Sequence, residues 1–82
     1  MSIEKISIRQ IKAARELLEW SQDDLAEASR VSQPTIGRLE AKGGDLGGRA
    51  ATQAKIRAAL EKAGIEFTNG DAPGVRLKRK KR

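Results

Sequence analysis

The sequence predicts a small all-α domain of four short helices with a C-terminal β-hairpin. Two observations predict it. Capping serines flanked by apolar residues recur three times before residue 40, and the apolar pattern changes to a two-residue period after residue 64. With 82 residues the chain has room for one domain with a core of about a dozen side chains. We expect residues 1–64 to form the helical part, 65–78 the hairpin and 79–82 a basic tail.

The three helix starts share one pattern. Ser7 with Gln10 and Ser21 with Asp24 form capping boxes, whereas Ser32 lacks the acidic or amide partner three residues later. Each serine also lies between two apolar residues that can pack as a hydrophobic staple: Ile6 and Ile11, Trp20 and Leu25, Val31 and Ile36. We interpret Trp20 as a core residue rather than a stacking platform. The apolar spacing after each start, and again near the C-terminus, predicts helices at 8–18, 22–29, 33–41 and 53–63.

Two segments without helical periodicity complete the predicted fold. Residues 42–48 contain four glycines and predict a connector, whose backbone either approaches a phosphate or simply links two helices. Residues 65–68 and 75–78 alternate apolar and polar side chains around a turn-rich stretch, which predicts a hairpin. Its apolar side chains are expected to face the helices: Ile65, Phe67, Val75 and Leu77. Because an isolated hairpin is marginally stable in water, it must pack on the helices or on another subunit.

The composition excludes several classes of protein. The chain has neither cysteine nor histidine, so it lacks the commonest metal ligands, the usual general base and the thiol nucleophile. We therefore expect no enzyme, no metal site and no cofactor. No apolar run approaches the roughly 20 residues of a membrane span, and the first ten residues lack the apolar centre of a signal peptide. The expected location is the cytoplasm, with no membrane contact.

The net charge of +6 is a property of the C-terminal tail. Residues 76–82 hold six of the 17 basic side chains and no acid, which leaves 11 basic and 11 acidic side chains in residues 1–75. The charge is therefore not independent support for a nucleic-acid site in the helical part. The tail either contacts phosphates without regard to sequence or serves as a disordered, solubilising end.

The third predicted helix, 33–41, carries the side chains best suited to reading DNA. Its apolar residues Ile36 and Leu39 would face the core, leaving Gln33, Pro34 and Arg38 on the outer side. Glutamine can bond adenine through two atoms, arginine can bond guanine in the same way, and an apolar surface can meet a thymine methyl. Without the surrounding pattern, the same outer side could be an ordinary solvated helix face.

The chain resembles the lambda-repressor-like (Cro/repressor, XRE-type) helix-turn-helix DNA-binding family. The resemblance covers about residues 8–40, with the motif itself at 21–40, and is carried by Arg15, Trp20, Ser21, Gln22, Leu25, Ala26, Val31, Ser32, Gln33, Thr35, Ile36, Arg38, Leu39 and Glu40. It implies that Gln22 binds a DNA phosphate and that Gln33, Pro34 and Arg38 face base edges. It also implies a salt bridge between Arg15 and Glu40, and a close crossing of two helices at Ala26.

Two features depart from the family pattern. The turn position that is often glycine is Arg30 here, and a non-glycine residue in a left-handed turn costs about 1–2 kcal/mol. The glycine-rich segment and the hairpin replace the fifth helix that often builds the family's dimer, so that dimer geometry does not carry over. We expect Arg30, Thr35, Lys42 and Arg49 to join Gln22 in contacting the DNA backbone, which positions the protein without choosing the sequence.

These observations predict a small transcriptional regulator that binds double-stranded DNA through helix 33–41 in the major groove. One such helix reads only about four to five base pairs, too few for selectivity, so we expect a homodimer on an inverted repeat, with the hairpin edge as a candidate dimer surface. The alternative is an antitoxin-like or co-regulator module that uses the same fold to hold a protein partner. Binding of nucleic acid through the tail alone is a third possibility.

Overall fold

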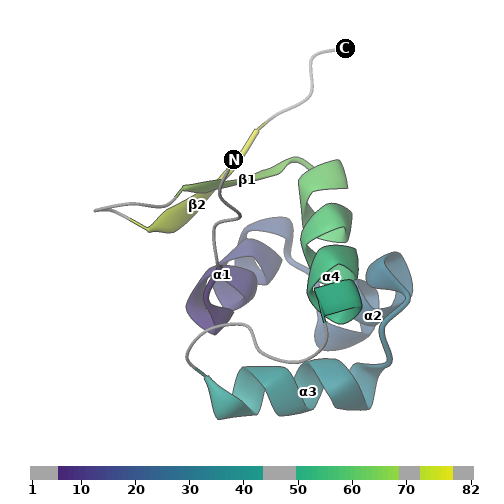
Figure 1. Ribbon diagram of the computed structural model, residues 1–82. Coiled ribbons are helices and arrows are strands. Elements are labelled where there is room, and N and C mark those ends of the chain that lie inside the picture. The colour runs from purple at the N-terminus through teal and green to yellow at the C-terminus, as the bar shows by residue number, and fades with distance from the viewer. Residues whose placement is uncertain (1–5, 44–49, 69–72, 79–82) are drawn as a thin grey trace.

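The computed structural model describes residues 6–43, 50–68 and 73–78. The predicted fold class is confirmed: four helices are followed by one two-stranded antiparallel hairpin (Figure 1). In chain order the elements are α1 (Ile8–Leu18), α2 (Gln22–Ser29), α3 (Gln33–Lys42), α4 (Ala50–Lys62), β1 (Ile65–Thr68) and β2 (Gly74–Leu77). Compared with the sequence prediction, α3 ends one residue later, α4 begins three residues earlier, and β2 is shifted by one residue toward the N-terminus.

The serine caps set the starts of the first three helices as predicted. At α1 the Ser7 hydroxyl accepts the backbone N–H of Gln10, whose side-chain oxygen in turn accepts the Ser7 N–H at 2.8 Å. At α2 Ser21 and Asp24 form the same reciprocal pair. At α3 the Ser32 hydroxyl accepts the N–H of Thr35 without a reciprocal bond. Each cap satisfies backbone donors that an α-helix leaves unpaired at its start.

The first two helices both end in a left-handed residue that is not glycine. Glu19 has φ 58° after α1, and Arg30 has φ 63° after α2. Each closes its helix through its own N–H, which Arg30 donates to the carbonyl of Ala26 at 2.8 Å. The sharp reversal at Arg30 lets α3 start only three residues later and so produces the tight turn between α2 and α3.

The core is built from the predicted apolar faces. Its fully buried large side chains come from all four helices: Ile8, Ile11, Leu25, Ile36, Ile56 and Leu60. Trp20 is partly buried against this cluster, in agreement with its interpretation as a core residue. The helices therefore hold one another through a single apolar centre, and burial of each such side chain contributes about 1.5–3 kcal/mol.

The hairpin closes one end of the helical bundle. Its strands pair in the register Ile65 with Leu77 and Phe67 with Val75, so these four side chains share one face. Ile65 is buried, and Phe67 and Val75 are half-buried, as predicted. Leu77 shares the face but is 39% exposed, which differs from the prediction that it packs on the helices. Its place at the end of β2 leaves it at the margin of the helical layer.

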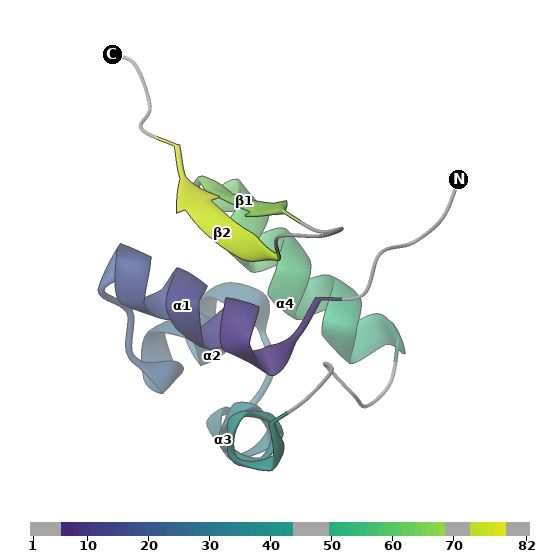
Figure 2. The same cartoon turned by 90° about the vertical axis from the view of Figure 1, so that its left-hand side faces the viewer.

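A buried glutamine ties the hairpin to α1. The Nε2 atom of Gln10 donates to the carbonyls of Thr68 and Gly74, at 2.9 and 3.0 Å. Gln10 is only 5% exposed, so these bonds form away from competing water. Figures 1 and 2 show the result: the hairpin lies over α1 and α4 at one end of the molecule, and α3 lies at the opposite end.

Candidate nucleic-acid interface

The arrangement of α3 separates a buried side from an open side. Ile36 is 1% exposed and Leu39 packs against the core, whereas Pro34 and Arg38 are exposed. Gln33 is half-buried at the first turn of the helix. The helix therefore presents its base-bonding residue types away from the core, as the sequence predicts, and it does so at the end of the molecule opposite the hairpin (Figure 1).

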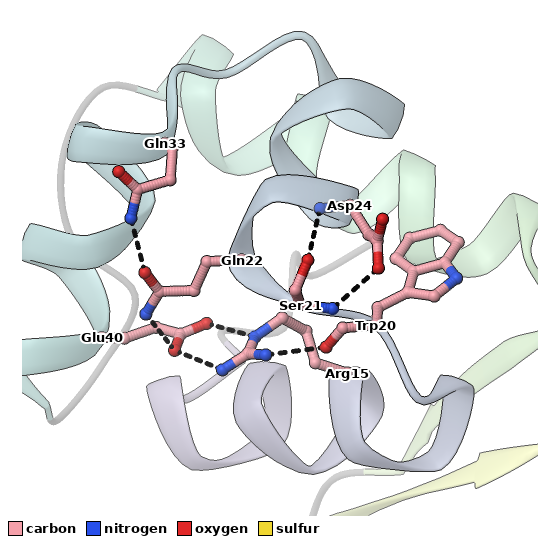
Figure 3. Close-up of polar contacts among 7 residues, drawn as sticks. All are labelled: Arg15, Trp20, Ser21, Gln22, Asp24, Gln33 and Glu40. Atoms are coloured by element: carbon pink, nitrogen blue, oxygen red, sulfur yellow. Dashed lines mark hydrogen bonds and ion pairs between the residues drawn. The ribbon is translucent and has the colours of Figure 1, made fainter.

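A chain of hydrogen bonds fixes the first residue of α3 to the rest of the domain (Figure 3). Gln33 Nε2 donates to Gln22 Oε1 at 2.7 Å, and Gln22 Nε2 donates to Glu40 Oε1 at 3.0 Å. The Gln33 oxygen remains an acceptor for an outside donor, and each amide nitrogen keeps a second N–H. Gln22 opens α2 while Gln33 opens α3, so this contact joins the two helices of the motif at their starts.

The salt bridge implied by the family resemblance is present. Arg15 Nε and Nη2 each donate to one oxygen of Glu40 at 2.8 Å, and Nη1 donates to the carbonyl of Trp20 at 2.8 Å. The Arg15 and Glu40 side chains are only 14% and 4% exposed. This two-pronged contact connects α1 to α3 and to the segment before α2, so it determines how the outer helix is held (Figure 3).

The two charges shift each other's proton affinity. The hydrogen bond from Arg15 to Glu40 raises the pKa of the Arg15 guanidinium, against the opposing effect of burial. Burial raises the pKa of the Glu40 carboxyl, but hydrogen bonds from Arg15 and Gln22 and the charge of Arg15 outweigh it and hold that pKa below its ordinary value. Both groups are therefore ionised near neutral pH, and the bridge is intact there.

A glycine in the second turn of α3 leaves room for the glutamine pair. A Cβ built at Gly37 would come to 3.4 Å from both Gln22 Oε1 and Gln33 Nε2. A methyl group there would be in ordinary van der Waals contact with this pair, while glycine leaves the surface beside it open. Gly37 lowers the intrinsic stability of the helix by about 1 kcal/mol relative to alanine. The open surface is therefore present despite the low helix propensity of glycine.

The remaining predicted contact residues surround α3. Thr35 is half-buried, and its hydroxyl accepts bonds from Ser32 at 2.9 Å and from Arg38 at the long distance of 3.5 Å. Arg30 is exposed in the turn, and Lys42 is exposed in the last turn of α3. The structure thus places cations at both ends of the helix. Arg49, three of the four loop glycines and the tail at 79–82 lie outside the described residues.

The sequence also matches a known protein family whose fold has this arrangement of helices. A helix-turn-helix family model matches residues 11–66, more than half of the chain, and includes the whole motif at 21–40. The chain belongs to the Cro/C1-type (XRE-like) helix-turn-helix family. This membership makes it a DNA-binding helix-turn-helix protein. No curated protein matches the chain closely enough to serve as a relative for comparison.

The hydrogen-bond network of this Cro/C1-type domain includes contacts that the sequence did not indicate. The resemblance implied the Arg15–Glu40 bridge, but not that Gln22 would join Glu40 to Gln33. The only sequence signal for it was the pair of glutamines that open two consecutive helices. Within the described ranges, no cluster of three or more side chains is arranged to hold a metal, and no helix is long and apolar enough to cross a membrane.

Proposed function

We propose that this protein is a small transcriptional regulator that recognises a specific double-stranded DNA sequence with α3 in the major groove. The observation that carries the proposal is the position of Gln33. Its amide is held at 2.7 Å by Gln22, on the open side of a helix whose other side is buried. A base-bonding group fixed before DNA arrives loses less side-chain entropy on binding, which favours specific contact.

Roles for the surrounding residues follow from their positions. Gln33 and Arg38 would bond base edges and Pro34 would contact a thymine methyl. Gln22, Arg30, Thr35 and Lys42 would contact the phosphate backbone on either side, together with Arg49. Gln22 keeps one N–H for a phosphate after its bond to Glu40. The protein would act by binding alone, without catalysis.

Sequence selection tests the proposal directly. The full chain is incubated with a random duplex library near physiological salt, and the bound sequences are enriched. We expect an inverted repeat whose half-sites lie about one helical turn apart. Enrichment of no sequence, with binding that vanishes as salt rises, would mean that the charge of the tail dominates and that α3 does not read bases.

Variants then assign the reading to α3. Arg38→Ala should weaken binding to the selected sequence by about fivefold to 150-fold, because one two-atom base contact contributes about 1–3 kcal/mol of discrimination. Lys62→Ala, an exposed charge at the end of α4 beside the hairpin, is the matched control and should change affinity by far less. If Arg38→Ala and Gln33→Ala both bind the selected sequence like the parent, the face is not a base-reading surface. Protein capture by the fold would then be the better account.

A further inference from the structure

Two exposed leucines lie at the same level on α1 and β2. The bond from Gln10 to the Gly74 carbonyl aligns the two elements, which run side by side in the same direction (Figure 2). From that point, Leu17 is about 10 Å farther along the helix and Leu77 about 10 Å farther along the strand. Leu17 is 44% exposed and Leu77 is 39% exposed, and they are the large apolar side chains that the described residues expose most. Together they form an apolar margin on one side of the molecule.

The backbone edge of β2 beside these leucines is open. Lys78 N–H donates to the Gly64 carbonyl at 2.8 Å, which fixes the alternation of bonded pairs along the hairpin. By that alternation the N–H and C=O groups of Val75 and Leu77 point away from β1. No hydrogen bond joins them to another residue of the described ranges. On the other strand, Ile65 is buried and the Arg57 guanidinium lies over the ring of Phe67, 5.5 Å from its centroid.

The solvent side of α1 carries a symmetrical pattern of charge. Arg9, Ala13, Glu16 and Leu17 are all exposed, with Ala13 in the middle, Arg9 one turn before it and Glu16 almost one turn after it. Arg9 and Glu16 form no ion pair with other described residues. If a second α1 packs antiparallel across Ala13, Arg9 of each copy meets Glu16 of the other. The small side chain of Ala13 permits that approach.

We propose that a second copy of this chain binds the α1–β2 face, defined by Arg9, Ala13, Glu16, Leu17 and the outer edge of β2. The two β2 strands pair antiparallel about Arg76 to make a four-stranded sheet, with Val75 of one copy opposite Leu77 of the other. The leucines of both copies are covered, and the Arg9–Glu16 pairs form on either side of the axis. This inference rests on the proposed function and names the partner that a reader of two half-sites requires.

Charge does not oppose this pairing at its centre. The two Arg76 side chains come opposite each other, and like charges across strands are destabilising. Each Arg76, however, already forms an ion pair with Glu66 of its own hairpin. The hydrogen bond and charge of Arg76 lower the pKa of the Glu66 carboxyl, so that the carboxylate is present near neutral pH. The approaching groups are therefore neutral pairs rather than bare cations.

The resulting dimer keeps both reading helices on one side. A two-fold axis normal to the joined sheet relates the two copies. Because the hairpin and α3 lie at opposite ends of each copy (Figures 1 and 2), both α3 helices would lie at the same end of the dimer. Copies joined through a lateral face have centres about one molecular width apart, and the two larger extents of the chain are 34 and 28 Å. Half-sites on successive turns of DNA are about 34–36 Å apart, a comparable spacing.

Single-cysteine variants test the contact, because the natural chain has no cysteine. Ala13→Cys lies on the proposed axis, and mild oxidation of the full chain without DNA should convert most of it to a disulfide-linked dimer. Ala58→Cys, exposed on α4, is the matched control and should remain monomeric on a denaturing non-reducing gel. Equal cross-linking of the two variants, or none at Ala13→Cys, overturns the proposal.

A charge exchange provides the second test. Arg9→Glu and Glu16→Arg should each weaken the dimer about twofold to thirtyfold in sedimentation equilibrium, because exposed ion pairs contribute modestly and the symmetry repeats each one. The double variant should restore the parent affinity, which a merely structural role for either residue would not produce. Circular dichroism confirms folding of each variant. A monomeric parent, or a double variant as weak as the singles, refutes the α1–β2 face. These measurements contain no DNA, so they fail or succeed independently of the sequence selection.

Discussion

Two arginine–glutamate pairs in this small domain have similar chemistry and very different surroundings. Arg15 and Glu40 join α1 to α3 with side chains 14% and 4% exposed, whereas Arg76 and Glu66 join β2 to β1 with side chains 69% and 41% exposed. Solvent competes with the second pair and screens it, but hardly reaches the first. The difference in burial means that the fold depends on the contact that holds α3, whereas it can lose the contact on the hairpin surface.

Burial makes the first pair depend on complete hydrogen bonding. Glu40 Oε2 accepts from Arg15 Nε, and Glu40 Oε1 accepts from both Arg15 Nη2 and Gln22 Nε2. Among the described residues, no buried side-chain nitrogen or oxygen lacks a partner. Since a buried charge without a partner is costly, removing one member leaves the other in an environment that no longer suits it.

The largest expected effect is the loss of Arg15. Arg15→Ala leaves the Glu40 carboxylate buried without its cation and should lower the free energy of unfolding by about 3–5 kcal/mol. Urea unfolding followed by circular dichroism measures the change. Arg57→Ala, which breaks the half-exposed pair with Glu61 on α4, is the matched control and should cost about 1 kcal/mol or less. Equal losses in the two variants would contradict the difference in burial.

A smaller loss is expected when the charge stays but the shape changes. Arg15→Lys keeps a cation near Glu40 but cannot make two parallel bonds and also reach the Trp20 carbonyl. We expect a loss of about 1–2 kcal/mol, roughly that of one or two hydrogen bonds. If the lysine variant unfolds like Arg15→Ala, charge alone contributes little and the fork geometry accounts for the effect.

The buried pair should also show in the response to acid. The pKa of Glu40 is lower in the folded protein than its ordinary value of 4.5, so its ionised form contributes stability above that value. This contribution is lost as the pH falls through the folded pKa. The stability advantage of the parent over Glu40→Gln should therefore be constant above about pH 5.5 and shrink steadily in more acidic buffers. An advantage independent of pH would contradict the assignment.

The exposed pair should give the smallest effect. Glu66→Gln removes the carboxylate that binds Arg76 on the open surface of the hairpin. The midpoint of urea unfolding of the monomer, measured at low protein concentration, should stay within experimental error at 0.5 M salt. A large shift would mean that exposure does not distinguish the two pairs.

Local patterns predicted the helix starts well because each start is decided by neighbouring residues. Ser7, Ser21 and Ser32 cap helices within three residues of themselves, and tertiary packing did not alter this. The fourth helix lacked such a cap in the sequence interpretation, and its start was placed three residues too late. Helix boundaries were thus predicted accurately only where the sequence contains a local start or stop signal.

Local sequence patterns did not predict the hydrogen bonds between residues that are far apart in the sequence. Gln10 was predicted only as a capping partner, yet its Nε2 also binds carbonyls 58 and 64 residues away. The Gln22–Gln33 bond likewise depends on how α2 and α3 cross. Leu77 lies on the predicted apolar face of the hairpin, but it is exposed because the helical layer ends there. Such outcomes depend on the spatial order of whole elements, which a residue pattern does not contain.

At Arg30, the left-handed residue in the turn of the motif, the stability of the domain and its binding of DNA make different demands on the side chain. Glycine at position 30 would adopt φ 63° without steric cost and should stabilise the domain by about 1 kcal/mol. It would also remove an exposed cation from the entrance to α3. If Arg30 contacts the DNA backbone as proposed, selection for a more stable domain and selection for tighter DNA binding would favour different residues at this one position. Variants recovered from a screen for heat resistance should accumulate glycine there, and a screen for operator binding should retain arginine.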